Sequence, residues 1–236
     1  KGLMDKKDFS SLHLHNHLSF SDIDNHMTKI IFNGSKNTLF SVALAHGSGA
    51  PMDTQFMTFF AEGLAKHGAR VARFEFPYMS ERRISGKKTL PNKIELLIKT
   101  WHQVIDEIGH EKLIIGGKSL GGRVASMIAD EANVLGLVCL GYPFHPFNRP
   151  DKLRISHLER LKTPSLFLQG DRDSFGNKDE ISGYTISDNI CFHWLVDGDH
   201  SFKPRRRSDR SKQQNLDDAL DAFVNFIQTL HRNSHG

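Results

Sequence analysis

Short apolar segments divide the chain at intervals, and most are separated by stretches in which apolar residues recur with the spacing of a helix. The strand-like segments are Thr28–Phe32, Thr38–Ala45, Ala69–Phe76, Lys112–Ile115, Val134–Leu140, Ser165–Leu168 and Ile190–Val196. The helix-like stretches are Asp53–Lys66, Asn92–Ile108, Leu120–Glu131, a short helix near Ser156–Leu161, and Leu216–Leu230. Apolar strands separated by helices are typical of a parallel sheet covered on both faces. The sequence therefore predicts an α/β protein, a three-layer α/β/α sandwich with a mostly parallel sheet.

The 236-residue chain shows no internal repeat and no low-complexity linker, so we expect one domain, spanning residues 28–236. Residues 1–27 form an N-terminal segment, either an edge strand or an arm. His13, His15 and His17 alternate in this segment, which favours one face of an exposed strand or an irregular arm over a metal site. Within the domain, Asp53 is expected to cap the first helix and Gly68 to end it.

Several observations indicate which environment and partners the chain has. The longest nearly apolar run, Val134–Tyr142, is far shorter than the roughly 20 residues of a membrane span, and the N-terminus has no apolar signal core. We therefore expect a cytoplasmic protein with no membrane partner.

Cys139 and Cys191 lie in apolar, strand-like segments, which favours buried small hydrophobic residues over a redox or metal role. No Cys/His spacing resembles a zinc site, and the sequence predicts no cofactor or metal.

The formal net charge is +4, and the excess is concentrated in two runs, Arg82–Lys88 and Lys203–Lys212. Such runs are usually solvated loops, and contact with an acidic substrate or partner is the alternative. The sequence contains no motif of a nucleic-acid-binding protein, so nucleic acid is not an expected partner.

Ligands of parallel α/β sheets bind beyond the carboxyl ends of the strands, so the residues that follow each strand matter most. Residues 117–121 (GKSLG) stand between the strand 112–115 and a helix, and they form the G-x-S-x-G pattern of a nucleophile elbow. The serine of this pattern adopts a strained backbone conformation, and larger side chains two positions away would collide with neighbouring elements. The same stretch resembles the end of a phosphate-binding P-loop, but that motif needs glycine where this chain has Lys112. Ser119 is therefore the candidate nucleophile.

A second loop supplies a candidate oxyanion hole. The strand 38–45 ends in residues 46–50 (HGSGA), and small residues after a His-Gly pair let a substrate approach backbone N–H donors. We assign the two donors to the backbone N–H groups of Ser48 and Leu120. The alternative is a tight glycine turn without a catalytic role.

The general base and its acid partner are expected later in the chain, in the order Ser, Asp, His. Asp171 and Asp173 follow the strand 165–168, and we favour Asp173 because it lies deeper in the loop. His200 follows the strand 190–196, whereas His193 lies inside that strand and is expected to be a packing or surface residue. In this arrangement His200 takes the proton of Ser119, and Asp173 orients the imidazole.

These segments resemble a known group of proteins. Residues 46–53 (HGSGAPMD), 74–79 (FEFPYM), 116–123 (GGKSLGGR) and 141–146 (GYPFHP) are similar to motifs of the KANL3/Tex30-type α/β-hydrolase family, itself similar to the dienelactone hydrolases. The resemblance covers about residues 38–202. It implies an eight-stranded type of hydrolase sheet and a triad of Ser119, Asp173 and His200. It also extends to members that act as components of larger assemblies.

Two further features bear on the substrate. Several cations follow strands at the carboxyl edge of the sheet, where they are candidates to bind a carboxylate or phosphate of the substrate. They are Lys118, Arg123, Arg82 and Arg83, with Lys87 and Lys88. The alternative is a solvated basic rim without a binding role. His46 is a further candidate substrate-binding residue. The connection between the strands 134–140 and 165–168 is too short for a cap domain, so we expect an open, shallow site that takes short acyl groups.

The sequence therefore predicts a serine hydrolase that cleaves a small carboxylic ester or thioester, with an anionic substrate as one option, through an acyl-enzyme on Ser119. Two alternatives remain: a non-catalytic hydrolase-fold binding module and a peptidase of the same fold.

Overall fold

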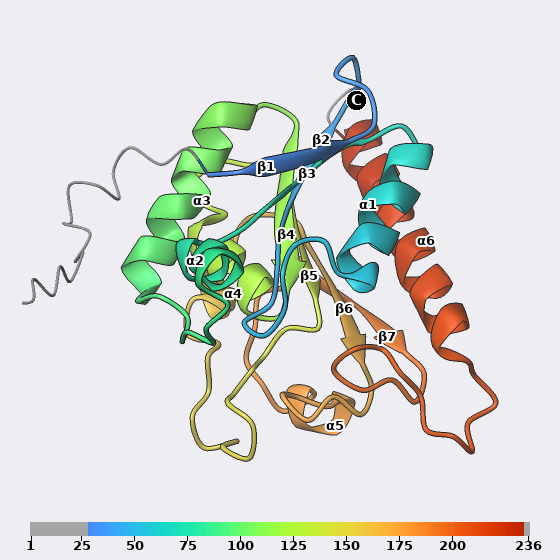
Figure 1. Cartoon of the computed structure of the whole chain (residues 1–236). Helices are drawn as coiled ribbons and strands as arrows, with labels where there is room; N and C mark the ends of the chain where they lie inside the picture. Colours follow the sequence, from blue (N-terminus) through green and yellow to red (C-terminus); the bar gives the residue numbers. More distant parts are fainter. Residues whose placement is uncertain (1–27, 234–236) are drawn as a thin grey trace, which may run out of the picture.

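The structure, a computed structural model, describes residues 28–233. The N-terminal segment 1–27, with its alternating histidines, therefore lies outside the described residues. Within them, seven strands form one sheet in the order β1-β3-β2-β4-β5-β6-β7 (Figure 1). The strands are β1 (Ile30–Asn33), β2 (Ser41–Ala45), β3 (Arg70–Phe74), β4 (Leu113–Lys118), β5 (Gly136–Leu140), β6 (Ser165–Gly170) and β7 (Ile190–Leu195).

Helices connect most of these strands. They are α1 (Gln55–Lys66), α2 (Pro77–Ser85), α3 (Ile94–Ile108), α4 (Leu120–Ile128), α5 (Lys178–Ile181) and α6 (Lys212–Asn233), with a 3-10 helix η2 at Leu158–Arg160. In the sheet, β3, β2, β4, β5, β6 and β7 lie side by side in that order, and each pair of neighbours is parallel. At one edge, β1 pairs antiparallel with β3. The mostly parallel sheet is confirmed. The resemblance implied an eight-stranded type of sheet, whereas the described residues form seven strands.

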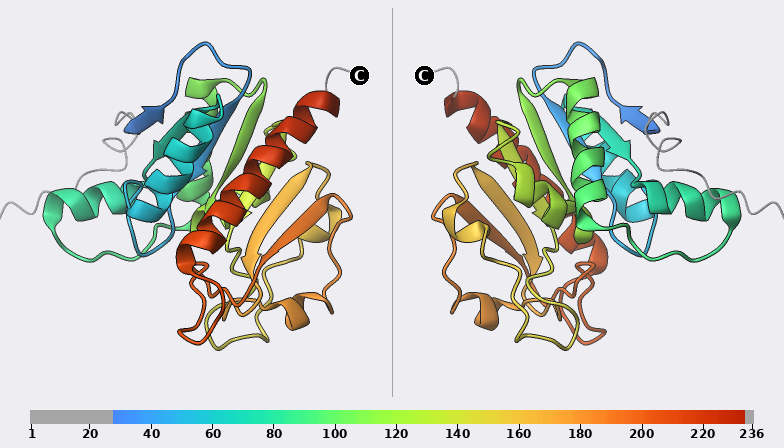
Figure 2. Two further views of the ribbon diagram at one scale, coloured as in Figure 1. Left: turned by 90° about the vertical axis from the view of Figure 1, so that its right-hand side faces the viewer. Right: turned by 90° about the vertical axis from the view of Figure 1, so that its left-hand side faces the viewer.

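Two helical layers cover the sheet, as the two views of Figure 2 show. Val42 and Leu44 of β2 belong to the hydrophobic core formed with α1 and α6. Ala43 and Ala45, which point to the other face because strand side chains alternate, belong to the core formed with α3 and α4. The predicted three-layer α/β/α sandwich is confirmed, and all parallel strands end at the edge that carries the candidate site.

The main difference from the sequence prediction lies after β3. We expected the basic residues Arg82 and Arg83 in a loop, but residues 77–85 form α2. Pro77 is favourable in the first turn of a helix because its missing N–H is not needed there, and Gly86 ends the helix in a left-handed conformation with φ of 67°. The two arginines are therefore held on a helix.

Smaller differences concern helix ends and the cysteines. Thr54, not Asp53, caps α1, because its side chain accepts a hydrogen bond from the N–H of Met57. The single turn α5, which Asn177 caps in the same way, has no counterpart among the elements expected from the sequence. Cys139 is buried as expected, but Cys191 is exposed because β7 is an edge strand.

The basic run near the C-terminus forms the predicted loop over residues 203–211, and Lys212 begins α6. Two of its arginines are paired: Arg205 with Asp197 and Arg210 with Asp218. No helix among residues 28–233 is long and apolar enough to cross a membrane.

Candidate active site

The turn between β4 and α4 presents Ser119 in a strained backbone conformation, with φ of 51° and ψ of −113°. The glycines two positions before and after Ser119 are required because a larger side chain would collide with β2. A Cβ atom at Gly117 would lie 2.2 Å, and one at Gly121 2.4 Å, from the carbonyl oxygen of Ala45 on β2. Only glycine therefore lets the turn pack against β2 and raise the Ser119 hydroxyl above the sheet.

Three side chains from separate loops meet above this turn. The Nε2 atom of His200, in the loop after β7, lies 2.9 Å from the Oγ atom of Ser119. The Nδ1 atom of His200 lies 2.7 Å from the Oδ2 atom of Asp173, in the loop after β6. The structure thus brings together the three residues that the sequence spacing singled out, in the geometry of an activated serine.

Asp173 is completely buried, and its carboxylate is held by several donors. The Phe175 N–H donates to Oδ1 at 2.9 Å, and the Gln169 amide donates to Oδ2 at 2.9 Å. Asp171 instead accepts a hydrogen bond from the N–H of Asp197 at 3.0 Å, which ties the loop after β6 to the end of β7. Asp173 is therefore the aspartate that contacts His200, whereas Asp171 contacts the backbone of Asp197.

Gln169 is a residue of the site that the sequence pattern did not single out. Its side chain is buried; besides its bond to Asp173, it donates to the carbonyl oxygens of Tyr142 and Gly176 and accepts from the Tyr142 N–H at 2.7 Å. The available signal was a polar residue at the end of the apolar strand β6. Gln169 therefore connects the carboxylate of Asp173 and the backbone of Tyr142, just after β5, in one hydrogen-bond network.

The surroundings of His200 favour its neutral form. Burial, followed by the positive charge of Lys118, lowers the pKa of His200 below its usual 6.5, while Asp173 opposes that shift. The neutral imidazole is the form that can accept a proton from a serine hydroxyl.

The side chain of Lys118 contacts other parts of the protein. Its Nζ atom donates to the carbonyl oxygen of His200 at 2.6 Å and lies 5.8 Å from the centre of the Phe56 ring. Burial lowers the pKa of Lys118 to about 8. In this structure the lysine contacts the loop that carries His200, and its expected role as a substrate ligand stays a prediction.

The loop after β2 passes directly against the nucleophile. A Cβ atom at Gly47 would lie 3.6 Å from the Cβ atom of Ser119. Among residues 28–233, no hydrogen bond uses the N–H of Ser48 or of Leu120 as donor. Both N–H groups are therefore available for a ligand, as an oxyanion hole requires.

His46, at the start of this loop, contacts two backbone groups. It is buried, and its Nδ1 atom lies 2.7 Å from the carbonyl oxygen of Gly47 while its Nε2 atom accepts from the N–H of Phe76 at 3.1 Å. Burial lowers its pKa, which agrees with a neutral ring that donates at Nδ1 and accepts at Nε2. Both ring nitrogens of His46 are therefore occupied by backbone groups in this structure, and its expected contact with a substrate stays a prediction.

The two arginines of α2 are also engaged. The Arg83 guanidinium contacts the buried carboxylate of Glu75 and, at 2.6 Å, that of Asp53. Arg82 donates to the carbonyl oxygens of Thr89 and, at 3.3 Å, of Ser48. The charge of Arg83 is therefore balanced by two carboxylates of the protein, and Arg82 supports the loop after β2. The expected role of both arginines in binding an anionic substrate stays a prediction.

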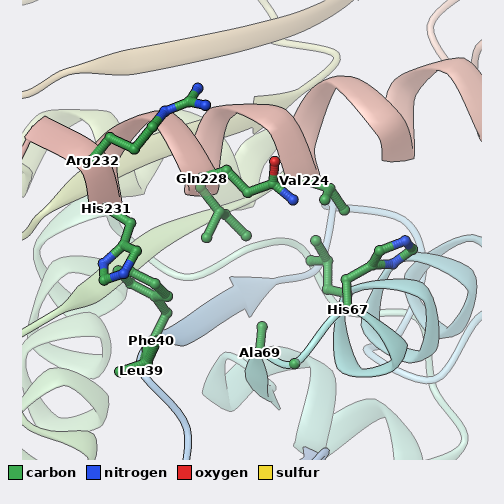
Figure 3. Close-up of a pocket in the computed structure, with 11 residues that line it drawn as sticks. Leu39, Phe40, His67, Ala69, Val224, Gln228, His231 and Arg232 are labelled. Atoms are coloured by element: carbon green, nitrogen blue, oxygen red, sulfur yellow. The ribbon is translucent and has the colours of Figure 1, made fainter.

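A pocket of about 350 Å³ lies at the opposite edge of the sheet, between the C-terminal ends of α1 and α6 (Figure 3). Phe40 and Ala69, which precede β2 and β3, line it together with Val224 and Gln228 of α6. The pocket is therefore separate from the triad. Among residues 28–233, no three His, Cys, Asp or Glu side chains gather where they could hold a metal ion.

Solved structures share this fold at low sequence identity. A dienelactone hydrolase from Anabaena variabilis is 19% identical, with a TM-score of 0.63; the match covers 86% of this chain and 99% of that one. A serine hydrolase without lid from Xanthomonas campestris is 15% identical, with a TM-score of 0.57, over 87% and 88% of the two chains. Est1E from Butyrivibrio proteoclasticus is 11% identical, with a TM-score of 0.61, over 85% and 95%.

The family model described as an alpha/beta hydrolase domain matches residues 39–228, which is most of the chain and includes every residue of the site. The fold, the position of the site at the carboxyl edge of the sheet and this match agree. The chain belongs to the α/β-hydrolase family.

Proposed function

We propose that this protein is a serine hydrolase that cleaves small carboxylic esters or thioesters through an acyl-enzyme on Ser119. The observation that carries the proposal is the continuous series from Asp173 through His200 to Ser119, with contacts of 2.7 and 2.9 Å. The motifs of the sequence further favour the KANL3/Tex30-type branch of the family.

In the first half of the reaction, the Nε2 atom of His200 takes the Ser119 proton while Oγ attacks the carbonyl carbon of the substrate. The negative charge that develops on the carbonyl oxygen is stabilised by the N–H groups of Ser48 and Leu120. Collapse of this intermediate breaks the bond to the leaving group, and His200 returns the proton to the leaving alcohol or thiol.

In the second half, His200 takes a proton from water, and the resulting hydroxide attacks the acyl carbonyl carbon. Collapse breaks the bond to Oγ, and His200 protonates Ser119 again. Asp173 keeps the imidazole oriented and stabilises its charged form in both halves, because its carboxylate lies on the Nδ1 side.

The size of the substrate follows from the connection between β5 and β6. Within residues 141–164 the structure forms one short helical turn, η2, which leaves no room for a cap domain. We therefore propose an open site for short acyl groups. Two neighbours support a small ester: the Xanthomonas campestris protein is described as lacking a lid, and Est1E has been solved with ferulic acid bound.

The test is turnover of matched substrates: p-nitrophenyl esters with acyl chains of two to eight carbons, an acetyl thioester and a peptide p-nitroanilide. We expect the short esters to give the highest kcat/KM and the anilide to remain uncleaved. Ser119→Ala and Asp173→Asn should lower kcat for the best ester by about 10⁴-fold, while the exposed control His110→Gln stays at the wild-type rate. Cleavage of the anilide in preference to the esters would instead assign a peptidase.

A further inference from the structure

Two arginines near the active site have no anionic partner. Among residues 28–233, no hydrogen bond or ion pair uses the guanidinium of Arg123 or Arg154, and the Nε atom of Arg123 is buried without a partner. By contrast, Lys118 donates to the His200 carbonyl oxygen, and Arg83 contacts two carboxylates.

A hydrogen-bonded series joins the backbones of the two arginines. Ser126 on α4 donates to the Arg123 carbonyl oxygen at 2.7 Å and lies 2.9 Å from the Nε2 atom of His157. The Tyr142 hydroxyl lies 3.4 Å from the same nitrogen and donates to the Arg154 carbonyl oxygen at 2.8 Å. Helix α4 and the connection after β5 are therefore fixed against each other at this cluster.

The cluster adjoins the catalytic residues on two sides. The N–H of Arg123 donates to the carbonyl oxygen of Ser119 at 2.9 Å, so Arg123 lies one helical turn, about 5.4 Å along the axis, beyond the nucleophile. Tyr142 bonds to Gln169, which in turn donates to Asp173. The cluster is therefore connected through backbone hydrogen bonds both to Ser119 and, by way of Gln169, to Asp173.

The charge of the cluster is uncompensated. Burial and the positive charge of Arg123 both lower the pKa of Arg154, and no carboxylate opposes this shift. Burial and Arg123 also lower the pKa of His157 to about 4, so this histidine is neutral near pH 7. Two partly buried like charges without a counter-ion are unfavourable, and a carboxylate or phosphate is the group that guanidinium pairs bind best.

We propose that Arg123 and Arg154 form an anion subsite beside Ser119, and that the natural substrate is an ester or thioester carrying a carboxylate or phosphate group. The proposal builds on the hydrolase function above and names its substrate class. Of the cations that the sequence suggested for an anionic substrate, it retains Arg123, and it adds Arg154 from the connection after β5.

The first test compares p-nitrophenyl hemisuccinate with p-nitrophenyl butyrate, which have acyl chains of the same length and differ in the terminal carboxylate. The wild type should have a higher kcat/KM for the hemisuccinate. Arg123→Gln and Arg154→Gln should each lower the ratio of hemisuccinate to butyrate kcat/KM by about tenfold, while the exposed arginine control Arg160→Gln keeps the wild-type ratio. A ratio that is the same in wild type and both variants would overturn the subsite.

The second test does not depend on turnover. The rise in Tm caused by succinate or by inorganic phosphate, against chloride of equal ionic strength, is measured for the wild type and for the double variant Arg123→Gln with Arg154→Gln. The subsite predicts a rise that the double variant loses, and the more effective anion indicates whether the substrate carries a carboxylate or a phosphate. Equal shifts in both proteins contradict it. Absence of ester turnover in a wild type that still shows the anion-dependent rise would contradict the hydrolase function and leave the subsite standing.

Discussion

Lys118 contacts the loop that carries His200, the proposed general base. It directly precedes the nucleophile in the chain, yet its ammonium group bonds to the backbone of His200 on another loop. The contact is close: a Cβ atom at Gly141 would lie 2.9 Å both from the Lys118 Nζ atom and from the His200 carbonyl oxygen. Lys118 therefore affects both the position and the charge state of the candidate base.

Replacing Lys118 by Met should change the pH dependence of the reaction. The acid limb of kcat/KM reports the pKa of His200, which must be neutral to act as a base, so activity falls as pH drops through that pKa. Because the Lys118 charge lowers this pKa, its removal should move the limb to higher pH. The pH profile of butyrate hydrolysis measures this, with the exposed control Lys152→Met. An unmoved limb in Lys118→Met would mean that the lysine charge does not reach His200.

Gln169 is the second residue whose role depends on burial. Replacing it by Leu leaves the buried N–H of Tyr142 without its partner and removes one of the two groups that donate to the Oδ2 atom of Asp173, the other being His200. We expect the free energy of unfolding to fall by about 2–4 kcal/mol, measured by urea denaturation, and kcat to fall as well because Asp173 loses a support. The exposed control Gln103→Leu should change neither quantity. Wild-type stability in Gln169→Leu would contradict the proposed network.

At the level of single residues, the sequence predicted the positions of Ser119, Asp173 and His200 because each follows a strand whose carboxyl end is at the same edge. The partners of Lys118 and His46 could not be predicted in this way. Lys118 bonds to a residue 82 positions later, and the acceptor is a backbone carbonyl that carries no sequence signal.

Among the secondary-structure elements, α2 departs most from the sequence prediction. Only Tyr78 and Met79 of this helix are buried, so its apolar face is too short to produce a periodic pattern. It is anchored instead by polar contacts, since Arg83 on α2 reaches Glu75 just after β3 and Asp53 before α1.

The replacement Arg83→Met tests this anchor. It leaves the carboxylate of Glu75, which is only 3% exposed, without its counter-ion. We expect the free energy of unfolding to fall by about 1–3 kcal/mol, and a second change, Glu75→Gln, to restore part of it. The ratio of hemisuccinate to butyrate kcat/KM should stay at the wild-type value. A tenfold lower ratio in Arg83→Met would return the anion preference to α2.

For the molecule as a whole, the alternation of apolar strands and helices was sufficient to predict the layers and the edge that carries the site. Three features were not encoded in that alternation. The antiparallel pairing of β1 with β3 and the exposure of Cys191 both arise at sheet edges, where burial imposes no pattern. The strand order also depends on which helices pack together, a tertiary property that local periodicity does not specify.

If Ser119 is an activated nucleophile, a fluorophosphonate probe should label it, because such probes react with activated serines whatever their natural substrate. We expect the wild type to be labelled at Ser119, as mass spectrometry of the modified peptide would show. Labelling should be lost in Ser119→Ala and His200→Ala and kept in His110→Gln. A folded wild type that takes up no label would mean that Ser119 is not activated and would indicate a binding module on a hydrolase fold.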